Sequence, residues 1–223
     1  MKPIRTKAIV LRRTNYGEAD RVVQLLTPDH GKVAVMARGV RREKSRLAGG
    51  IELFSVSDVT LVSGKSDLWT LTGAKMETFF AYIMTDYERM QFGYEAIKQV
   101  SRIAEQVNDP AFYELLATTL VSLNEPTIAL DITATWFWLQ LAILQGQGLN
   151  LATDANGMKL VEDKNYRFDT DDMAFVFHEN GEFTTEHIKL LRLLSAQKPA
   201  VVAQVNGVTP LLPLVRQLAE RVQ

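Results

Sequence analysis

Short apolar runs separated by turn residues fill the first 76 positions of the chain. A half-buried strand alternates apolar and polar side chains and is roughly 4–8 residues long. Such runs lie at Ala8–Leu11, Val22–Leu26, Val33–Ala37, Phe54–Val62 and Leu68–Leu71. Five strands with only one long connection, from Gly39 to Leu53, predict a small β-barrel.

The fourth run changes its alternation midway. Phe54 and Val56 share one parity, whereas Val59 and Leu61 have the opposite parity. An extra residue near Ser57–Asp58 would reconcile the two halves. The pattern therefore predicts a β-bulge in this strand, of the kind that barrels use to bend.

After Gly73 the apolar period changes from two to three or four residues, which is typical of amphipathic helices. Apolar residues spaced in this way from Ile83 to Val107 predict one long helix that ends before Asn108. Further helices are predicted at Ala111–Leu123, from Pro126 to about Gly146, from Thr184 or Thr185 through Ser195, and from about Pro210 to Val222. Residues 148–183 carry acids and Asn-Gly turn pairs and predict a loop or small hairpin.

The predicted fold class is therefore α+β. A β-barrel domain occupies residues 1–78, and an all-helical domain occupies residues 79–223. The helical domain contains a small irregular insertion, free of cysteine, at about residues 148–183. A chain of 223 residues is long enough for two modest domains.

Charge is distributed unevenly between the two predicted domains. Residues 1–50 hold 12 basic and 4 acidic side chains, a net charge of +8, while residues 51–223 hold 13 and 22, a net charge of −9. The formal net charge of −1 hides this asymmetry. An excess of cations on one domain is typical of a protein that binds a polyanion.

The clearest candidate for polyanion binding is the segment from Arg38 to Arg46, which follows the third predicted strand. Its five cations accompany a single acid, Glu43. Lys32 has the same parity as Arg38 on that strand, so both side chains are expected on one face of the barrel. The predicted DNA-binding residues are Lys32, Arg38, Arg41, Arg42, Lys44 and Arg46.

Arg and Lys bind nucleic acid by neutralising phosphates and releasing condensed counterions. Barrels that bind single strands usually add aromatic side chains on which bases stack. Tyr16, Phe54 and Trp69 are the candidates in this half of the chain. Phe54 and Trp69 are better explained as core residues, and Tyr16, beside Gly17 in a predicted turn, is the aromatic most expected to be exposed.

Motifs for enzymatic chemistry are missing from the sequence. It has no phosphate-binding loop of the Walker type, no Gly-x-Gly-x-x-Gly, no Gly-x-Ser-x-Gly and no His-Glu-x-x-His. With no cysteine, thiolate zinc sites and cysteine nucleophiles are excluded. We therefore predict a protein that is not an enzyme, with no catalytic residues, no metal and no cofactor. No apolar run approaches the roughly 20 residues of a membrane-spanning helix, and we expect a cytoplasmic, nucleoid-associated protein.

The N-terminal segment resembles the bacterial recombination mediator family RecO. The residues that carry the resemblance are Tyr16–Arg21, Leu25–Thr27, His30–Lys32, Ala37–Arg42, Lys44–Arg46, Leu53–Phe54 and Leu71–Thr72. They cover about residues 4–76, while the helical remainder agrees in length and layout. The resemblance implies an OB-fold barrel that binds single- and double-stranded DNA, with a helical domain behind it. The family's basic DNA-binding loop corresponds to Arg38, Arg41, Arg42, Lys44 and Arg46.

The resemblance also implies partners and a pathway. Family members anneal complementary strands and work with RecR and the acidic C-terminal tail of single-strand-binding protein in a RecFOR-type pathway, which helps to load RecA onto coated strands. No motif fixes the residues that would hold that tail, so they stay unassigned; Lys98 and Arg102 on the first predicted helix are named without such support. Many members carry a four-cysteine zinc module near residues 148–183, but this chain has no cysteine, so no zinc is expected there.

Two other functions are compatible with the sequence. An OB-type RNA-binding or RNA-annealing module would share the cations but would discriminate through the 2′-hydroxyl. A metal-dependent nuclease would use carboxylates between residues 162 and 172. These acids are Glu162, Asp163, Asp169, Asp171 and Asp172, and their spacing is not that of a calcium loop.

Overall fold

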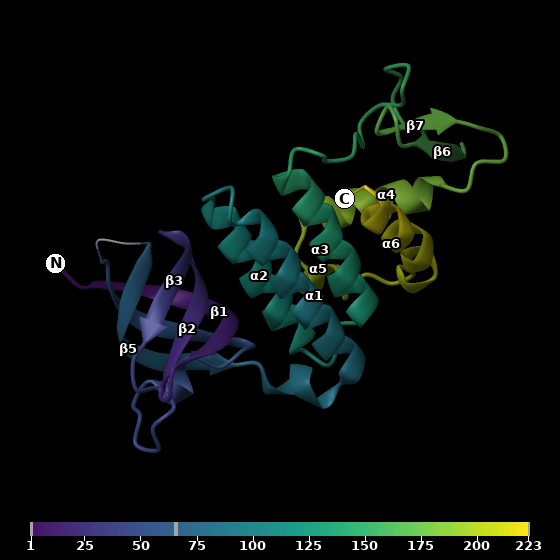
Figure 1. Cartoon of the computed structure of the whole chain (residues 1–223). Helices are drawn as coiled ribbons and strands as arrows, with labels where there is room; N and C mark the ends of the chain where they lie inside the picture. Colours follow the sequence, from purple (N-terminus) through teal and green to yellow (C-terminus); the bar gives the residue numbers. More distant parts are fainter. Residues whose placement is uncertain (1, 65–66, 223) are drawn as a thin grey trace. The chain divides into compact units, whose positions relative to one another are not determined.

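The computed structural model describes residues 2–64 and 67–222, which form two compact units, residues 1–124 and 125–223. Figure 1 shows a β-barrel and helices in the first unit and mainly helices in the second. The first unit contains β1 (Ile4–Tyr16), β2 (Asp20–Thr27), β3 (Gly31–Ala37), η1 (Ala48–Gly50), β4 (Ser55–Val62), β5 (Leu68–Phe79), η2 (Ala81–Thr85), α1 (Tyr87–Ile103) and α2 (Pro110–Leu123).

The five strands close into a barrel in the order β1-β2-β3-β5-β4, as the α+β prediction with an N-terminal OB-type barrel requires. All neighbouring pairs are antiparallel except β3 and β5, which run parallel. Inward side chains alternate along β3, where Val33, Val35 and Ala37 are buried. Together with residues such as Val10, Leu25 and Leu61, they fill the barrel. This pattern positions the outward side chains of the same strands for contacts with solvent or ligands.

The strand β4 differs from the prediction in one respect. It alternates without interruption, because Ser55 and Ser57 point inward and are fully buried with Val59 and Leu61. The predicted β-bulge at Ser57–Asp58 is therefore wrong. The register shifts of the β4–β5 pair instead place extra residues on β5. Two inward serines hid the alternation, because the prediction assumed that only apolar side chains face the core.

The strand β5 is also longer than predicted and continues to Phe79. Its second half carries few buried residues, so that no alternation was visible in the sequence. The predicted helix from Ile83 correspondingly begins later, at Tyr87, after the 3₁₀ helix η2. Asp86 fixes this start because its carboxylate accepts a hydrogen bond from the Arg89 backbone N–H at 3.1 Å.

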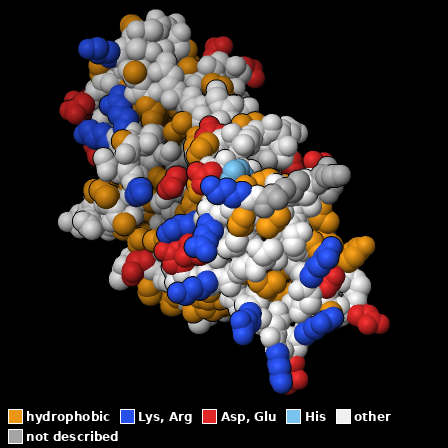
Figure 2. Space-filling view, turned by 90° about the vertical axis from the view of Figure 1, so that its left-hand side faces the viewer, with side chains coloured by type: hydrophobic (Ala, Val, Ile, Leu, Met, Phe, Trp, Pro, Cys, Tyr) orange, Lys and Arg blue, Asp and Glu red, His pale blue; other side chains and the backbone are white. Residues whose placement is uncertain are grey.

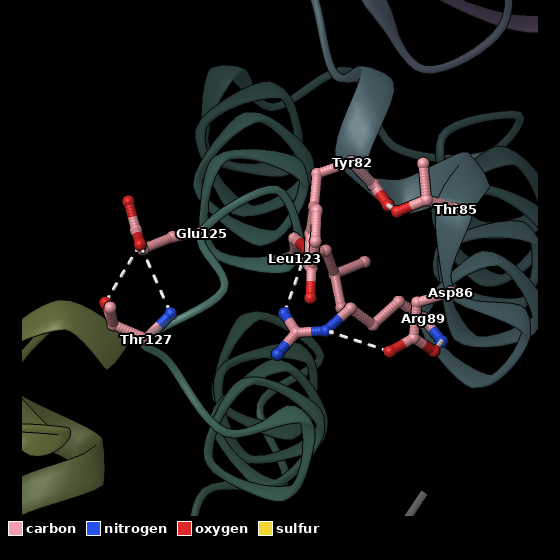
Figure 3. Close-up of polar contacts among 7 residues, drawn as sticks. All are labelled: Tyr82, Thr85, Asp86, Arg89, Leu123, Glu125 and Thr127. Carbon is pink, nitrogen blue, oxygen red and sulfur yellow. Dashed lines mark hydrogen bonds and ion pairs between the residues drawn. The ribbon is translucent and has the colours of Figure 1, made fainter.

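The buried cation Arg89 connects η2, α1 and the end of α2 (Figure 3). Its guanidinium donates to the Leu123 carbonyl oxygen at 3.0 Å and lies 3.6 Å from the Asp86 carboxylate. The same group stacks over the Tyr82 ring, 5.3 Å from the ring centroid. A cation at the C-terminal end of a helix interacts favourably with the helix dipole. These contacts hold the two helices of the first unit together.

The helices α1 and α2 pack against the barrel and belong to the same compact unit. They cover the outer face of β1–β2–β3 at one end, where Ile9 and Leu26 are paired and both buried although they lie outside the barrel core. The predicted domain boundary at residue 78 falls at the end of β5, and it stays a prediction.

The second unit contains one apolar helix and several shorter elements. They are α3 (Leu130–Leu144), β6 (Tyr166–Asp169), β7 (Ala174–Phe177), α4 (Thr185–Ala196), α5 (Pro199–Val202), η3 (Thr209–Leu211) and α6 (Leu212–Arg221). The helix α3 packs against α4, α5 and α6 and buries Trp136 and Phe137. None of the helices among residues 2–64 and 67–222 is long and apolar enough to cross a membrane.

Residues 166–177 form the small hairpin expected of the insertion. Its strands β6 and β7 pair antiparallel, and Phe175 on β7 is fully buried. The Phe175 ring lies 5.2 Å from Phe168, 5.3 Å from Phe183 and 6.4 Å from Tyr166, all in edge-on geometry. Aromatic pairs of this kind contribute beyond the area that they bury. An aromatic cluster therefore organises the insertion.

Protonation of His187 is expected to destabilise the start of α4. Burial lowers the pKa of this imidazole, and its neutral Nδ1 accepts a hydrogen bond from the Thr184 backbone N–H at 3.2 Å. Because the folded pKa lies below the unfolded value of about 6.5, stability is constant above that pH and falls as pH decreases through the interval between the two values. Thermal unfolding across this interval should show a decrease of a few degrees.

The control for this prediction is His187→Gln, whose amide oxygen can take the same place in the capping box but does not titrate. The variant should lose less stability than the native chain over the same pH interval. Identical pH dependences of the two proteins would contradict the assigned role of His187.

Candidate nucleic-acid interface

The connection between β3 and β4, residues 38–54, is a long loop anchored at both ends. At its start, the Gly39 N–H donates to the Asp20 carboxylate at 2.7 Å, and the Arg41 N–H donates to the Ala19 carbonyl oxygen at 2.9 Å. The Arg41 guanidinium also donates to the Gly17 carbonyl oxygen at 3.2 Å. The loop is thereby tied to the turn between β1 and β2. Gly39 has φ of +62°, a conformation in which a side chain would be strained.

The end of the loop is anchored by burial. Val40 and Ile51 point into the barrel core and are almost completely buried. Gly50 lies so close to β5 that a Cβ atom there would be 2.5 Å from the Ala74 Cβ and 2.6 Å from the Ala74 carbonyl carbon. The Arg13 guanidinium reaches the Glu52 carboxylate at 2.6 Å. Residues 41–46 therefore project from a fixed base.

The predicted cations Arg38, Arg41, Arg42, Lys44 and Arg46 are all exposed on this loop. Within the part of the chain that the structure describes, none of these five side chains forms an ion pair with a carboxylate. Figure 2 shows Lys and Arg side chains gathered at the lower end of the view, where Figure 1 places the loop. The loop thus presents uncompensated positive charge on a preorganised backbone.

The same residues fall within a known family domain. Residues 1–80 match the family described as "Recombination protein O N terminal". The chain is 34% identical over 164 residues to the DNA repair protein RecO of Dehalococcoides mccartyi, covering 73% of this chain and 64% of that protein. It is 39% identical over 138 residues to the protein of the same name from Roseiflexus sp., covering 61% and 48%. Residues 1–80 therefore match the N-terminal domain of the RecO family, and the chain is similar to RecO proteins beyond that domain.

A third relative extends the match into the second unit. The DNA repair protein RecO of Alkaliphilus metalliredigens is 29% identical over 189 residues, which cover 84% of this chain and 76% of the relative. The alignment with the Dehalococcoides protein, by contrast, spans less than two thirds of that relative's length. The similarity to RecO proteins is therefore clear, while the activities of whole RecO proteins are carried to this chain as proposals.

In this chain, Lys32 is placed differently from the five loop cations. Its ammonium donates to the Ser101 carbonyl oxygen at 3.0 Å and to the Ser101 Oγ at 2.9 Å, and it pairs with the Glu105 carboxylate. Only 9% of the Lys32 side chain is exposed. The predicted parity is correct, because Lys32 points out of the barrel, but α1 covers it. Lys32 is therefore a link between barrel and helix in this conformation.

The three aromatic candidates also differ in position. Phe54 is buried at the end of the loop with φ of +54° and packs against Tyr94 at 4.9 Å between ring centroids. Trp69 is half-buried on β5 beside His30. Tyr16, at the end of β1, is 59% exposed, and the turn that follows it is the one bonded to Arg41. Tyr16 is consequently the aromatic residue best placed beside the loop.

The acidic residues considered for a metal lie in the hairpin region of the second unit. The Asp169 carboxylate accepts backbone hydrogen bonds from Asp171 at 2.9 Å and Asp172 at 3.3 Å, which is the geometry of a turn. Among the described residues, no three His, Asp or Glu side chains lie close enough together to hold a metal ion. The Asp169 carboxylate is therefore occupied in this turn by backbone hydrogen bonds.

Proposed function

We propose that this RecO-family chain is a DNA-binding recombination mediator that acts in DNA repair without catalysing a reaction. The observation that carries the proposal is the basic loop, whose five exposed cations stand on a base fixed by Asp20 and Gly50. Because the backbone of the loop is fixed before binding, less conformational entropy is lost when DNA binds. The loop would contact phosphates of single- or double-stranded DNA and read no bases.

Charge neutralisation explains how such a protein would anneal complementary strands. Each strand carries closely spaced phosphates, so two strands repel one another. A surface that presents cations to both lowers that repulsion and raises their local concentration. This mechanism forms no covalent bond and requires no nucleotide cofactor.

The proposed partners follow from the family assignment. They are RecR, the acidic C-terminal tail of single-strand-binding protein and, indirectly, RecA, whose loading onto coated strands the chain would assist. The support for them is that the relatives are named as DNA repair proteins. Direct pull-down of each purified partner by this chain is the measurement that checks this assignment.

Binding of single-stranded DNA by the native chain is expected to depend steeply on salt. Fluorescence anisotropy of a labelled oligonucleotide, measured across a salt series, should give a log–log slope of several units, at about 0.7 per neutralised phosphate. The cause is the release of counterions from phosphates that meet the loop. An absence of binding, or binding that salt does not affect, would overturn the proposal.

An RNA-binding function makes a different prediction in the same assay. A matched RNA oligonucleotide should compete no better than DNA if the loop contacts phosphates alone, because both strands carry the same charge. A strong preference for RNA would indicate recognition of the 2′-hydroxyl and would replace the proposed function with an RNA-binding one.

A further inference from the structure

A second cationic feature of the first unit lies away from the basic loop, in a cleft between the barrel and α1. The cleft has a volume of about 390 Å³ and is lined by Leu11, Arg12, Gln24, Lys32, Tyr94, Ile97, Lys98, Ser101, Arg102 and Glu105. Four of these side chains are cations and one is an acid. Lys32 pairs with Glu105, and the Lys98 ammonium lies 3.4 Å from the Glu95 carboxylate while staying 75% exposed. The exposed cations of the cleft are Arg12, Lys98 and Arg102.

The cleft and the basic loop lie along one outer face of the barrel. Arg12, Gln24 and Ala34 pair across β1, β2 and β3, and none of the three is buried. Arg38 follows four residues after Ala34, which corresponds to about 13 Å along a strand. The outward side chains between these rows, Val22 and Met36, are only half-buried. An uncovered strip of the barrel therefore leads from the loop to the cleft.

Tyr94 adds an aromatic surface at the cleft. Its side chain is 44% exposed although its ring packs against Phe54. Bases stack on half-packed aromatic rings of this kind in proteins that bind single strands, and one OB-fold accommodates roughly 4–16 nucleotides. The combination of cations and an accessible ring suits a nucleotide chain.

We infer that the cleft is a second contact site for single-stranded nucleic acid, in which Arg12, Lys98 and Arg102 bind phosphates and Tyr94 stacks on a base. The inference rests on the proposed function, because the same strand would run from the basic loop across β3, β2 and β1 to α1. The other apolar residues in the lining, Leu11 and Ile97, are 6% and 4% exposed. An acidic peptide that also docks through an apolar side chain would find little apolar surface here. A nucleic-acid strand is therefore the better occupant.

The test compares two charge reversals of equal size in the full chain. The cleft variant is Lys98→Glu/Arg102→Glu, and the control is Arg5→Glu/Lys75→Glu, which lies in a separate hollow over β1, β4 and β5. With a labelled oligothymidine of about 25 nucleotides, the cleft variant should lose about 1.4 units of the log–log salt slope, at about 0.7 per phosphate. The control should keep the native slope.

The Tyr94→Leu variant tests the stacking contact independently of charge. It should bind roughly tenfold more weakly with an unchanged salt slope, because it removes a base contact and no phosphate contact. Thermal unfolding of each variant checks that the packing against Phe54 survives. Native-like affinity of folded Tyr94→Leu would overturn the stacking assignment.

The outcomes separate this inference from the proposed function. If reversal of the basic loop lowers the salt slope while the cleft variant matches its control, the cleft inference fails alone. If neither reversal alters binding, the proposed function fails as well. Binding of a short Asp- and Glu-rich peptide that the cleft variant loses, with no change in DNA binding, would assign the cleft to a protein partner and overturn the inference.

Discussion

Reversal of three loop charges, in Arg41→Glu/Arg42→Glu/Lys44→Glu, is expected to weaken binding of single-stranded DNA by a factor of about 100 or more at about 0.1 M salt. Three lost phosphate contacts at about 0.7 units each reduce the log–log slope by about 2. The ratio of native to variant affinity therefore grows about 100-fold for each tenfold decrease in salt concentration. Repulsion between the new carboxylates and the phosphates adds to this loss. Anisotropy titration across a salt series measures both quantities.

A matched control keeps the same change in net charge. Lys159, Lys164 and Arg167 are exposed cations in the insertion of the second unit, and their triple reversal to Glu should leave the slope near the native value. Circular dichroism should show that both variants are folded. Equal losses in the two variants would mean that overall charge, rather than the loop, determines binding.

The second large effect is expected for stability. Gly50→Ala should destabilise the first unit by about 3 kcal/mol, because the added methyl group would meet both the side chain and the backbone of Ala74. Relief of this clash requires η1 to move away from β5, which also shifts the base of the basic loop. Thermal unfolding and amide hydrogen exchange of residues 4–79 measure the loss.

Gly49→Ala is the control for this prediction. Gly49 precedes Gly50 in the same 3₁₀ helix, and the substitution adds the same methyl group. A Cβ atom at Gly49, however, would meet no atom within 4 Å. It should be near neutral in stability and should bind DNA like the native chain. Comparable destabilisation by both substitutions would contradict the role assigned to the close approach between Gly50 and Ala74.

The sequence predicted those strands whose inward positions are apolar. Val33, Val35 and Ala37 showed β3 directly, because each is buried and each alternates with a less buried residue. The same rule failed in β4, where Ser55 and Ser57 occupy inward positions. Alternation reports the chemistry of side chains and only indirectly their direction, so small polar residues in a core make a strand hard to recognise.

The candidate site was predictable as far as it depends on local sequence. The five loop cations were identified from their clustering after a strand, and they are exposed. The contact of Lys32 with Ser101 and Glu105 was not predictable, since it joins residues about 70 positions apart and depends on how α1 packs. The cleft beside Tyr94 was missed for the same reason.

Closure of the barrel has a consequence for how the chain folds during synthesis. The first strand needs β4 as a neighbour, with Ile4 opposite Leu61, and β3 needs β5, with Val35 opposite Trp69. Pairings between such distant segments form slowly, because the intervening chain must first be ordered. On the ribosome, the arginine-rich segment would emerge after the β1–β2 turn that ties its start but before β5, against which Gly50 packs. Until β5, which ends at Phe79, has been synthesised, the end of this cationic segment lacks the strand that holds it.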